Sequence, residues 1–238
     1  MRLYGLIGKK LEHSLSKKYF EKKFLDNNIK NIKYINIELE SIDNLKDIIK
    51  DYKLSGLNIT IPYKISILNH IDKIDLLSKK VGSINTIKIS NNKIIGFNTD
   101  LPAFINSIKP ILKNRENALI LGDGGVAQSI KSGLEILNIK YITISRKGKY
   151  NYEYLNKENI KEFDIIINAT PLGMYPNINL YPNIPYEYIN KNCLLYDTVY
   201  NPELTKFLKF GKKYGCDIKN GLEMLHLQAD YSWEFWNK

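Results

Sequence analysis

Residues 116–138, ENALILGDGGVAQSIKSGLEILN, decide the fold of this chain. The stretch opens with a continuous apolar run, which is typical of a parallel strand buried on both faces. A glycine turn follows at 122–125, and then a helix. Such a turn lets the backbone approach a pyrophosphate, whose charge lies against the helix N-terminus. The stretch therefore predicts a Rossmann-type dinucleotide-binding unit, in which the Asp123 carboxylate would repel the pyrophosphate unless it points outward.

The strand expected next, at 140–146, indicates which dinucleotide binds. A site specific for NAD usually has Asp or Glu near the end of this strand, where the acid holds the ribose 2′-hydroxyl. Here the strand ends in Ser145, Arg146 and Lys147, with two cations and no acid. Arg146 can bind a 2′-phosphate through two hydrogen bonds, and Lys147 adds a positive charge. The sequence therefore predicts NADP as the cofactor.

Strands and helices alternate along the whole chain, which favours an α/β fold with mostly parallel sheets. In the first hundred residues we expect strands at 3–8, 33–39 and 56–61, helices at 15–29, 41–52 and 65–82, and a hairpin that turns at Asn91-Asn92. Ser41 is a candidate N-cap. A second segment begins near Leu101, with further buried strands at 164–170 and 193–200 and helices at 203–215 and 221–236.

Composition narrows the class of protein. The formal net charge is +10, yet the lysines are scattered and form no basic arm, so we expect no nucleic-acid partner. No apolar run approaches the ~20 residues that span a bilayer, and no signal peptide opens the chain, so a cytoplasmic protein without membrane contact is expected. Two cysteines are too few for a disulfide framework, and His13, His70 and His226 lack the spacing of a metal site.

Small polar side chains recur where the expected strands of the first segment end. In a parallel sheet, ligands bind outside the carboxyl ends of the strands. Hydroxyls and amides are the groups that recognise a carboxylate and vicinal hydroxyls. The clusters are Ser14 with Ser16, Thr60 with Lys64, Asn85 with Thr86, and Asn98 with Thr99 and Asp100. They predict a site for a small polyhydroxylated acid, at which Lys64 handles a proton.

Eight motifs carry a resemblance to a known family. In chain order they are GKKLEHSLS, GLNITIPYK, GSINT, GFNTD, LGDGGVAQS, INATPLGM, YDTVYNPELT and GLEMLHLQA. This series resembles that of the shikimate dehydrogenases from residue 8 onward. Departures include Leu101-Pro102 after Asp100, where the family commonly has glycine, and Ser145-Arg146-Lys147 in place of Asn-Arg-Thr.

The resemblance implies two α/β domains around a cleft. Residues 1–100, completed by the C-terminal helix 221–238, would form the substrate-binding domain, and residues 101–220 the NADP-binding domain. The implied activity is the reversible NADPH-dependent reduction of 3-dehydroshikimate to shikimate, on the route to chorismate and aromatic amino acids. A monomer or homodimer is expected.

The resemblance also assigns roles to residues. Lys64 and Asp100 match the catalytic pair. The residues that match substrate-binding positions are Ser14, Ser16, Thr60, Lys64, Asn85, Asp100, Tyr200 and Gln228. Those that match or fall at cofactor-binding positions are Gly122, Asp123, Gly124, Gly125, Val126, Ser145, Arg146, Lys147, Thr170, Thr198 and Gly221.

Hydride transfer to a carbonyl requires a proton, or a hydrogen bond, at the oxygen. A lysine oriented by a carboxylate can supply either, and the sequence leaves open whether Lys64 is a true general base or a hydrogen-bond donor. Lys64 and Asp100 could also form a purely structural ion pair. Two alternative functions stay open as well: a quinate/shikimate dehydrogenase using NAD(P), and a non-catalytic relative of the family.

Overall fold

The structure is a computed structural model that describes residues 1–12 and 14–238, so His13, for which no metal role is predicted, lies outside the described residues. The chain divides into two compact units. The first unit comprises Met1–Asp100 and His226–Lys238, and the second comprises Leu101–Leu225. None of the helices in the described residues is both long and apolar enough to cross a membrane.

The first unit is built on a six-stranded mixed sheet with the order β2-β1-β3-β5-β6-β4. Its strands are β1 (Arg2–Gly8), β2 (Ile32–Glu38), β3 (Leu54–Ile59), β4 (Lys73–Ile74), β5 (Thr86–Ser90) and β6 (Lys93–Phe97). Strand β1 runs parallel to β2 and β3, whereas β5 is antiparallel to both of its neighbours. The hairpin predicted at Asn91-Asn92 is confirmed, and both asparagines have the positive φ (50° and 58°) that its tight turn needs.

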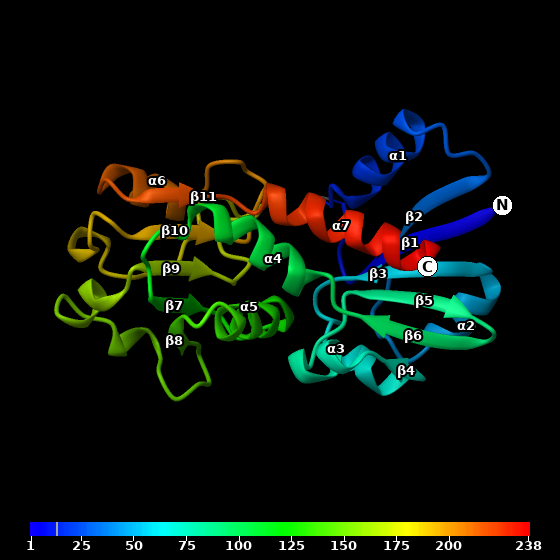
Figure 1. Ribbon diagram of the computed structural model, residues 1–238, viewed down its shortest axis with the longest axis horizontal. Helices are drawn as coiled ribbons and strands as arrows, with labels where there is room; N and C mark the ends of the chain where they lie inside the picture. The colour runs from blue at the N-terminus through cyan, green and yellow to red at the C-terminus, as the bar shows by residue number, and fades with distance from the viewer. Residues whose placement is uncertain (13) are drawn as a thin grey trace. The chain divides into compact units, whose positions relative to one another are not determined.

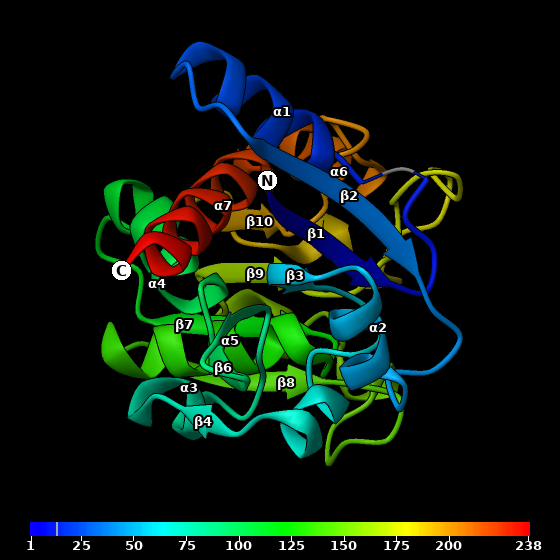
Figure 2. The same cartoon turned by 90° about the vertical axis from the view of Figure 1, so that its right-hand side faces the viewer.

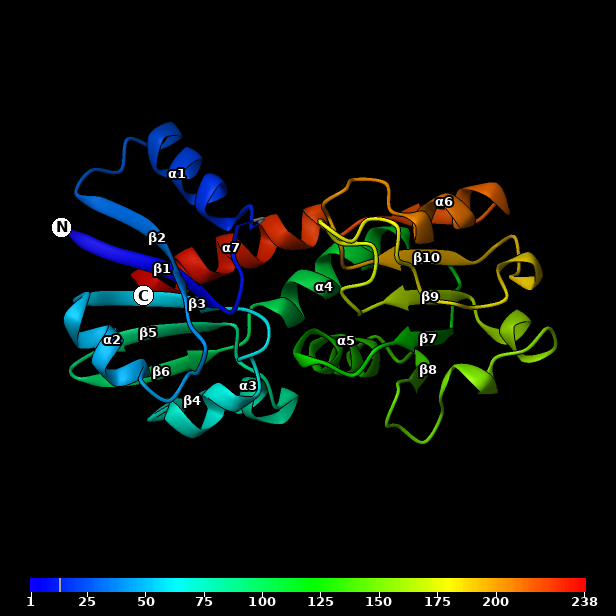
Figure 3. The same cartoon turned by 180° about the vertical axis from the view of Figure 1, so that it is seen from behind.

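Helices cover both faces of this sheet (Figures 1 and 2). They are α1 (Ser16–Asp26), α2 (Leu45–Asp51), α3 (Leu76–Val81), the 3-10 segment η1 (Ser66–His70) and the part of α7 (Leu222–Asn237) that starts at His226. Tyr4 of β1 packs with Phe20 of α1 and Trp236 of α7 on one face. Ile7, the third residue after Tyr4, packs with Leu45 of α2 on the other. Figure 3 shows the ribbon of α2 and of the sheet from behind. Alternation along β1 thus divides the core into two layers.

Two of the helix predictions in this unit are wrong in their bounds. The helix predicted at 41–52 begins only at Leu45, and Ser41 is not its N-cap. Ser41 instead donates to the Asp43 carboxylate (2.6 Å) and accepts from the Asp43 N–H (3.2 Å), which closes a turn before the helix. The segment 65–82, predicted to be mainly helical, is divided into η1, β4 and α3 because β4 pairs with β6.

The second unit holds a five-stranded parallel sheet with the order β11-β10-β9-β7-β8. Its strands are β7 (Asn117–Leu121), β8 (Lys140–Ile144), β9 (Ile165–Asn168), β10 (Leu194–Asp197) and β11 (Asp217–Lys219). All residues of β9 and β10 are buried, as parallel strands covered on both faces should be. The strand order reverses beside β7, so the turn after β7 lies where parallel sheets bind ligands.

The helices of this unit are α5 (Gly125–Ile136), α6 (Lys206–Lys213) and α4 (Asp100–Ile108), which begins with the last residue of the first unit's N-terminal stretch. Short 3-10 segments complete it: η2 (Lys109–Ile111), η3 (Tyr152–Tyr154), η4 (Asn159–Glu162) and η5 (Tyr186–Tyr188). Helix α4 has no counterpart among the predicted elements. Phe104 of α4 meets Tyr196 of β10 edge-to-face, with ring centroids 5.5 Å apart, so α4 packs on the sheet.

Candidate functional site

Lys64 and Asp100 form a largely buried ion pair in the first unit. The Lys64 Nζ lies 2.6 Å from the Asp100 Oδ2, and the two side chains are 16% and 5% exposed. Lys64 lies in the turn after β3, whereas Asp100 follows β6 as the first residue of α4. The fold therefore brings together the amine and the carboxylate that the sequence singled out.

Asn85 holds this carboxylate in place. Its Nδ2 donates to the Asp100 Oδ1 (2.9 Å), and its Oδ1 accepts from the Thr99 backbone N–H (2.7 Å). Because a backbone N–H can only donate, the second bond fixes which way round the Asn85 amide lies. The same Nδ2 is 3.5 Å from the Gln228 Oε1 on α7. Four of the predicted substrate-binding residues are thus linked in one group: Lys64, Asn85, Asp100 and Gln228.

Ser232 on α7 lies behind this group and was not predicted. It is fully buried, and its Oγ is 2.8 Å from the Asn58 Nδ2, 2.7 Å from the Thr86 Oγ1 and 3.2 Å from the Thr99 Oγ1. It also donates to the Gln228 carbonyl (2.8 Å). Its position four residues after Gln228 places it on the same helix face, which is the signal that the sequence offered.

The two predicted serines lie at the start of α1. Ser16 is the first residue of this helix, and the Ser14 Oγ accepts from the Ser16 N–H (3.3 Å). A helix N-terminus carries a partial positive charge, which suits a substrate carboxylate. Thr60 directly follows β3, where its N–H donates to the Ile7 carbonyl (2.9 Å). The roles of these three residues toward the substrate stay predictions.

In the second unit, the glycine turn has the features that a pyrophosphate requires. Gly122 has a φ of +110°, and a Cβ there would lie 2.9 Å from the Thr170 Cγ2, so glycine is needed on both counts. Gly124 is the N-cap of α5, and a Cβ on it would meet nothing within 4 Å in the described residues. This open side lies at the N-terminus of a 12-residue helix that starts with Gly125 and Val126. These features fit the diphosphate of a dinucleotide.

The Asp123 carboxylate is held along α5. It pairs with the Lys131 ammonium and accepts from the Gln128 Nε2 (3.1 Å). Gln128 lies in the first turn of α5 and Lys131 in the second, so the carboxylate is directed along the side of the helix. Lys131 and Gln128 thus hold the Asp123 carboxylate in the orientation that the sequence analysis required.

The predicted adenosine end of the site follows β8. The Ser145 N–H donates to the Tyr150 carbonyl (3.0 Å), which folds the segment back onto the end of the strand. Arg146 and Lys147 are exposed at the tip of this turn. Two exposed cations one and two residues after Ser145 fit a 2′-phosphate.

Asn168, at the end of β9, binds two threonines of the predicted cofactor site, Thr170 and Thr198. Asn168 itself was not predicted as a site residue. Its Oδ1 accepts from the Thr170 hydroxyl (2.6 Å) and its carbonyl from the Thr198 hydroxyl (2.9 Å). A Cβ on Gly221 would lie 2.3 Å from the Thr198 carbonyl oxygen, so glycine is required there. Tyr200 is half-buried in the same unit, and its predicted role toward the substrate stays a prediction.

Asn168 also donates to the Asp197 carboxylate (3.0 Å). Asp197 is fully buried and accepts two more hydrogen bonds, from the Thr205 hydroxyl (2.6 Å) and the Val199 N–H (3.0 Å). Burial raises the pKa of Asp197 from 3.8 to about 7, against the lowering effect of these bonds.

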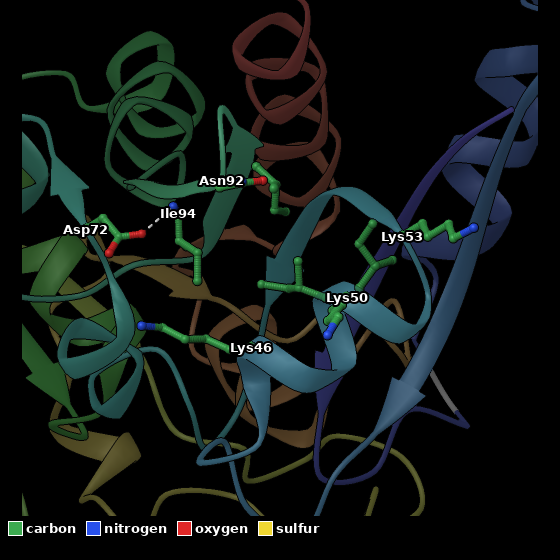
Figure 4. Close-up of a pocket in the computed structure, with 9 residues that line it drawn as sticks. Lys46, Lys50, Lys53, Asp72, Asn92 and Ile94 are labelled. Carbon is green, nitrogen blue, oxygen red and sulfur yellow. Dashed lines mark hydrogen bonds between the residues drawn. The ribbon is translucent and has the colours of Figure 1, made fainter.

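A pocket of about 610 Å³ lies elsewhere in the first unit, between α2 and the β5–β6 hairpin (Figure 4). It is lined by Lys46, Ile49, Lys50, Lys53, Leu54, Asp72, Ile89, Asn92 and Ile94. None of the predicted site residues is among them. The amines of its three lysines point in different directions in Figure 4, so they do not converge on one anion. This pocket is therefore not the predicted substrate site.

Three comparisons with known proteins show that this chain is similar to shikimate dehydrogenases. A family model described as the shikimate dehydrogenase substrate binding domain matches residues 6–87. The shikimate dehydrogenase (NADP(+)) of Methanococcus aeolicus is 40% identical over 256 residues, which cover 99% of this chain and 91% of the relative. That of Clostridium beijerinckii is 39% identical, with 100% and 93% covered. The crystal structure of shikimate dehydrogenase 1 from Peptoclostridium difficile superposes with a TM-score of 0.90 at 34% identity, with 100% and 92% covered.

Proposed function

Because the chain belongs to the shikimate dehydrogenase family, we propose that it interconverts 3-dehydroshikimate and shikimate with NADP as the cofactor, and that Lys64 and Asp100 are its catalytic pair. The observation that carries the assignment of the pair is the 2.6 Å contact between the Lys64 ammonium and the Asp100 carboxylate, which Asn85 supports from behind. A quinate enzyme and a non-catalytic relative are the outcomes against which this proposal is tested.

NADPH, when bound, would supply a hydride to the substrate carbonyl carbon. Negative charge then grows on the carbonyl oxygen, and a donor aimed at this atom stabilises the transition state. Lys64 is the donor: its side chain is 16% exposed, and the Asp100 carboxylate, 2.6 Å from its ammonium, holds it in one orientation. In the oxidation direction, the same amine receives the hydroxyl proton or its hydrogen bond.

The other groups bind and orient. Ser14 and Ser16 hold the substrate carboxylate at the N-terminus of α1, where the helix dipole adds to their hydrogen bonds. Thr60, Asn85 and Gln228 bind ring hydroxyls. Tyr200 keeps its predicted role as a substrate-binding residue.

The cofactor side is divided among three groups of residues. The glycine turn holds the diphosphate at the N-terminus of α5, and Arg146 binds the 2′-phosphate beside Ser145 and Lys147. Thr170, Thr198 and Gly221 line the nicotinamide half, where Asn168 fixes both threonines.

The test is a matrix of substrates and cofactors. Purified protein is offered shikimate or quinate with NADP⁺ or NAD⁺, and the absorbance of the reduced nicotinamide is followed. We expect shikimate with NADP⁺ to give the highest kcat/KM. A preference for quinate with NAD⁺, or no turnover with any of the four combinations, would overturn the proposal.

The role of Lys64 has its own test. Lys64→Ala should lower kcat by about a thousandfold or more, since it removes the donor at the reacting oxygen. Shikimate binding, measured by calorimetry, should persist because Ser14 and Ser16 are retained. Unchanged turnover would remove Lys64 from the mechanism and leave its ion pair with Asp100 a structural one.

A cytoplasmic location and a monomeric or dimeric state remain predictions. Light scattering after size exclusion measures the oligomeric state, and a trimer or a larger assembly would contradict the prediction.

A further inference from the structure

The glycine turn of the second unit contains an acid where an anion is expected to bind. Asp123 stands between Gly122 and Gly124, next to the N-terminus of α5. The partial positive charge of a helix N-terminus attracts a side-chain carboxylate as well as a phosphate, and aspartate is a preferred N-cap residue. Asp123 is therefore a competitor for the site that the cofactor diphosphate needs.

In the structure, Asp123 does not act as a cap. The N-cap of α5 is Gly124, and within the described residues no side chain makes a capping hydrogen bond there. The Asp123 carboxylate is paired instead with the Lys131 ammonium, and the Gln128 amide donates to it at 3.1 Å. The Lys131 side chain is only 20% exposed, so its amine is held along the helix and does not extend into solvent.

We propose that Lys131 is a positioning residue for the dinucleotide: by neutralising Asp123 and holding it along α5, it keeps the helix N-terminus open for the cofactor diphosphate. The proposal rests on the proposed function, because it concerns the same cofactor. The Asp123 side chain of this pair is 45% exposed, and ion pairs with a solvent-exposed partner contribute little to folding stability. The effect of the pair on the anion site can therefore be measured separately from any loss of fold.

The proposal predicts a specific pattern of cofactor affinities. Lys131→Met leaves the Asp123 carboxylate with the Gln128 amide but without its neutralising cation, which should raise the Kd for NADP⁺ by about tenfold. The Kd for NAD⁺ should rise by a similar factor, because both dinucleotides share the diphosphate. The KM for shikimate should stay within about twofold of the wild-type value, since Lys131 is not among the residues that we assign to the substrate.

Removing the competitor should remove the need for the lysine. Asp123→Ala alone should bind NADP⁺ at least as tightly as the wild type. The double variant Asp123→Ala/Lys131→Met should match Asp123→Ala within about twofold, which is strong coupling between the two sites. If Lys131 acted only as a positive charge that attracts the cofactor, the double variant would stay as weak as Lys131→Met.

Lys113→Met is the matched control. It also breaks a lysine–aspartate pair of the second unit, in which the Lys113 Nζ lies 2.7 Å from the Asp217 Oδ2, but on a part of the chain with no predicted cofactor role. Its Kd for NADP⁺ should be unchanged.

Kd is measured by calorimetry, and turnover and thermal unfolding are recorded for each variant. The inference would be overturned if Lys131→Met had an unchanged Kd for NADP⁺, or if the double variant bound NADP⁺ as weakly as Lys131→Met. In either case, turnover by the wild type would still support the proposed function. A wild type that neither binds NADP⁺ nor oxidises shikimate would instead overturn the proposed function.

Discussion

Asp100→Asn removes one charge from the catalytic pair with almost no change in shape. The Asp100 carboxylate accepts from the Lys64 ammonium at 2.6 Å and from the Asn85 Nδ2 at 2.9 Å. The two donors reach different oxygens of the carboxylate, and an asparagine has an oxygen at only one of these two positions, so it can accept from only one of the donors. The Asn85 amide cannot turn over to compensate, because its Oδ1 accepts from the Thr99 N–H at 2.7 Å. One of the two contacts must therefore become donor against donor.

The size of the effect follows from this count. A hydrogen bond to a charged group contributes about 1.5–3 kcal/mol. If the lost bond is the one that orients Lys64 at the reacting oxygen, the loss appears in the transition state and corresponds to a roughly 10–150-fold fall in kcat. The KM for NADP⁺ should change by less than about twofold, since Asp100 has no predicted contact with the cofactor.

Initial rates of shikimate oxidation, with each substrate varied in turn, give kcat and both KM values. Asp51→Asn is the matched control, because Asp51 is an exposed acid of the same unit at the end of α2. Thermal unfolding of both variants shows that the fold persists. A kcat for Asp100→Asn within about threefold of the wild type, or an equal fall in Asp51→Asn, would refute the role that we assign to Asp100.

Three further predictions concern the rest of the chain. Arg146→Ala should raise the KM for NADP⁺ at least about tenfold more than that for NAD⁺, since only NADP⁺ carries the 2′-phosphate; equal effects in steady-state kinetics would contradict that assignment. Ser232→Ala should lower the free energy of unfolding in urea by about 1–3 kcal/mol, because the buried Asn58 amide loses a partner, and a loss below about 0.5 kcal/mol would contradict the network. Asp197 keeps its proton up to about pH 7 when folded but loses it near pH 4 when unfolded, so stability should fall as the pH rises between these values, by up to about 4 kcal/mol. Urea titrations at several pH values measure that slope, and Asp197→Asn should flatten it; an unchanged slope would assign the pH dependence to other groups.

Local chemistry accounts for the parts of the fold that the sequence predicted well. The turn at Asn91-Asn92 needs positive φ at two positions, and asparagine adopts it readily. The strand, glycine turn and helix of 116–138 form a unit whose signals are all contiguous. The two-residue strand β4 was not predicted, because it is a strand only through its pairing with the distant β6.

The candidate site shows the same division between local and distant information. Lys64 and Asp100 are 36 residues apart in sequence, so no spacing rule could bring them together, and their pairing was predicted from a family resemblance. Asn168 and Ser232 have no special sequence context of their own. Their importance comes from partners up to 174 residues away in sequence, as between Asn58 and Ser232, and only the fold shows these contacts.

The core of the first unit has a consequence for synthesis on the ribosome. Trp236 donates its Nε1–H to the Ile87 carbonyl (2.9 Å) and stacks on Tyr4 with ring centroids 4.4 Å apart. The second unit lies wholly within Leu101–Leu225, so it can fold before Trp236 has been synthesised. Until then, the core layer around Tyr4 lacks this tryptophan. The second unit can therefore complete its fold before the first unit, although the first unit begins the chain. Until residue 236 has emerged from the ribosome, the nascent chain exposes an aromatic surface that chaperones can bind.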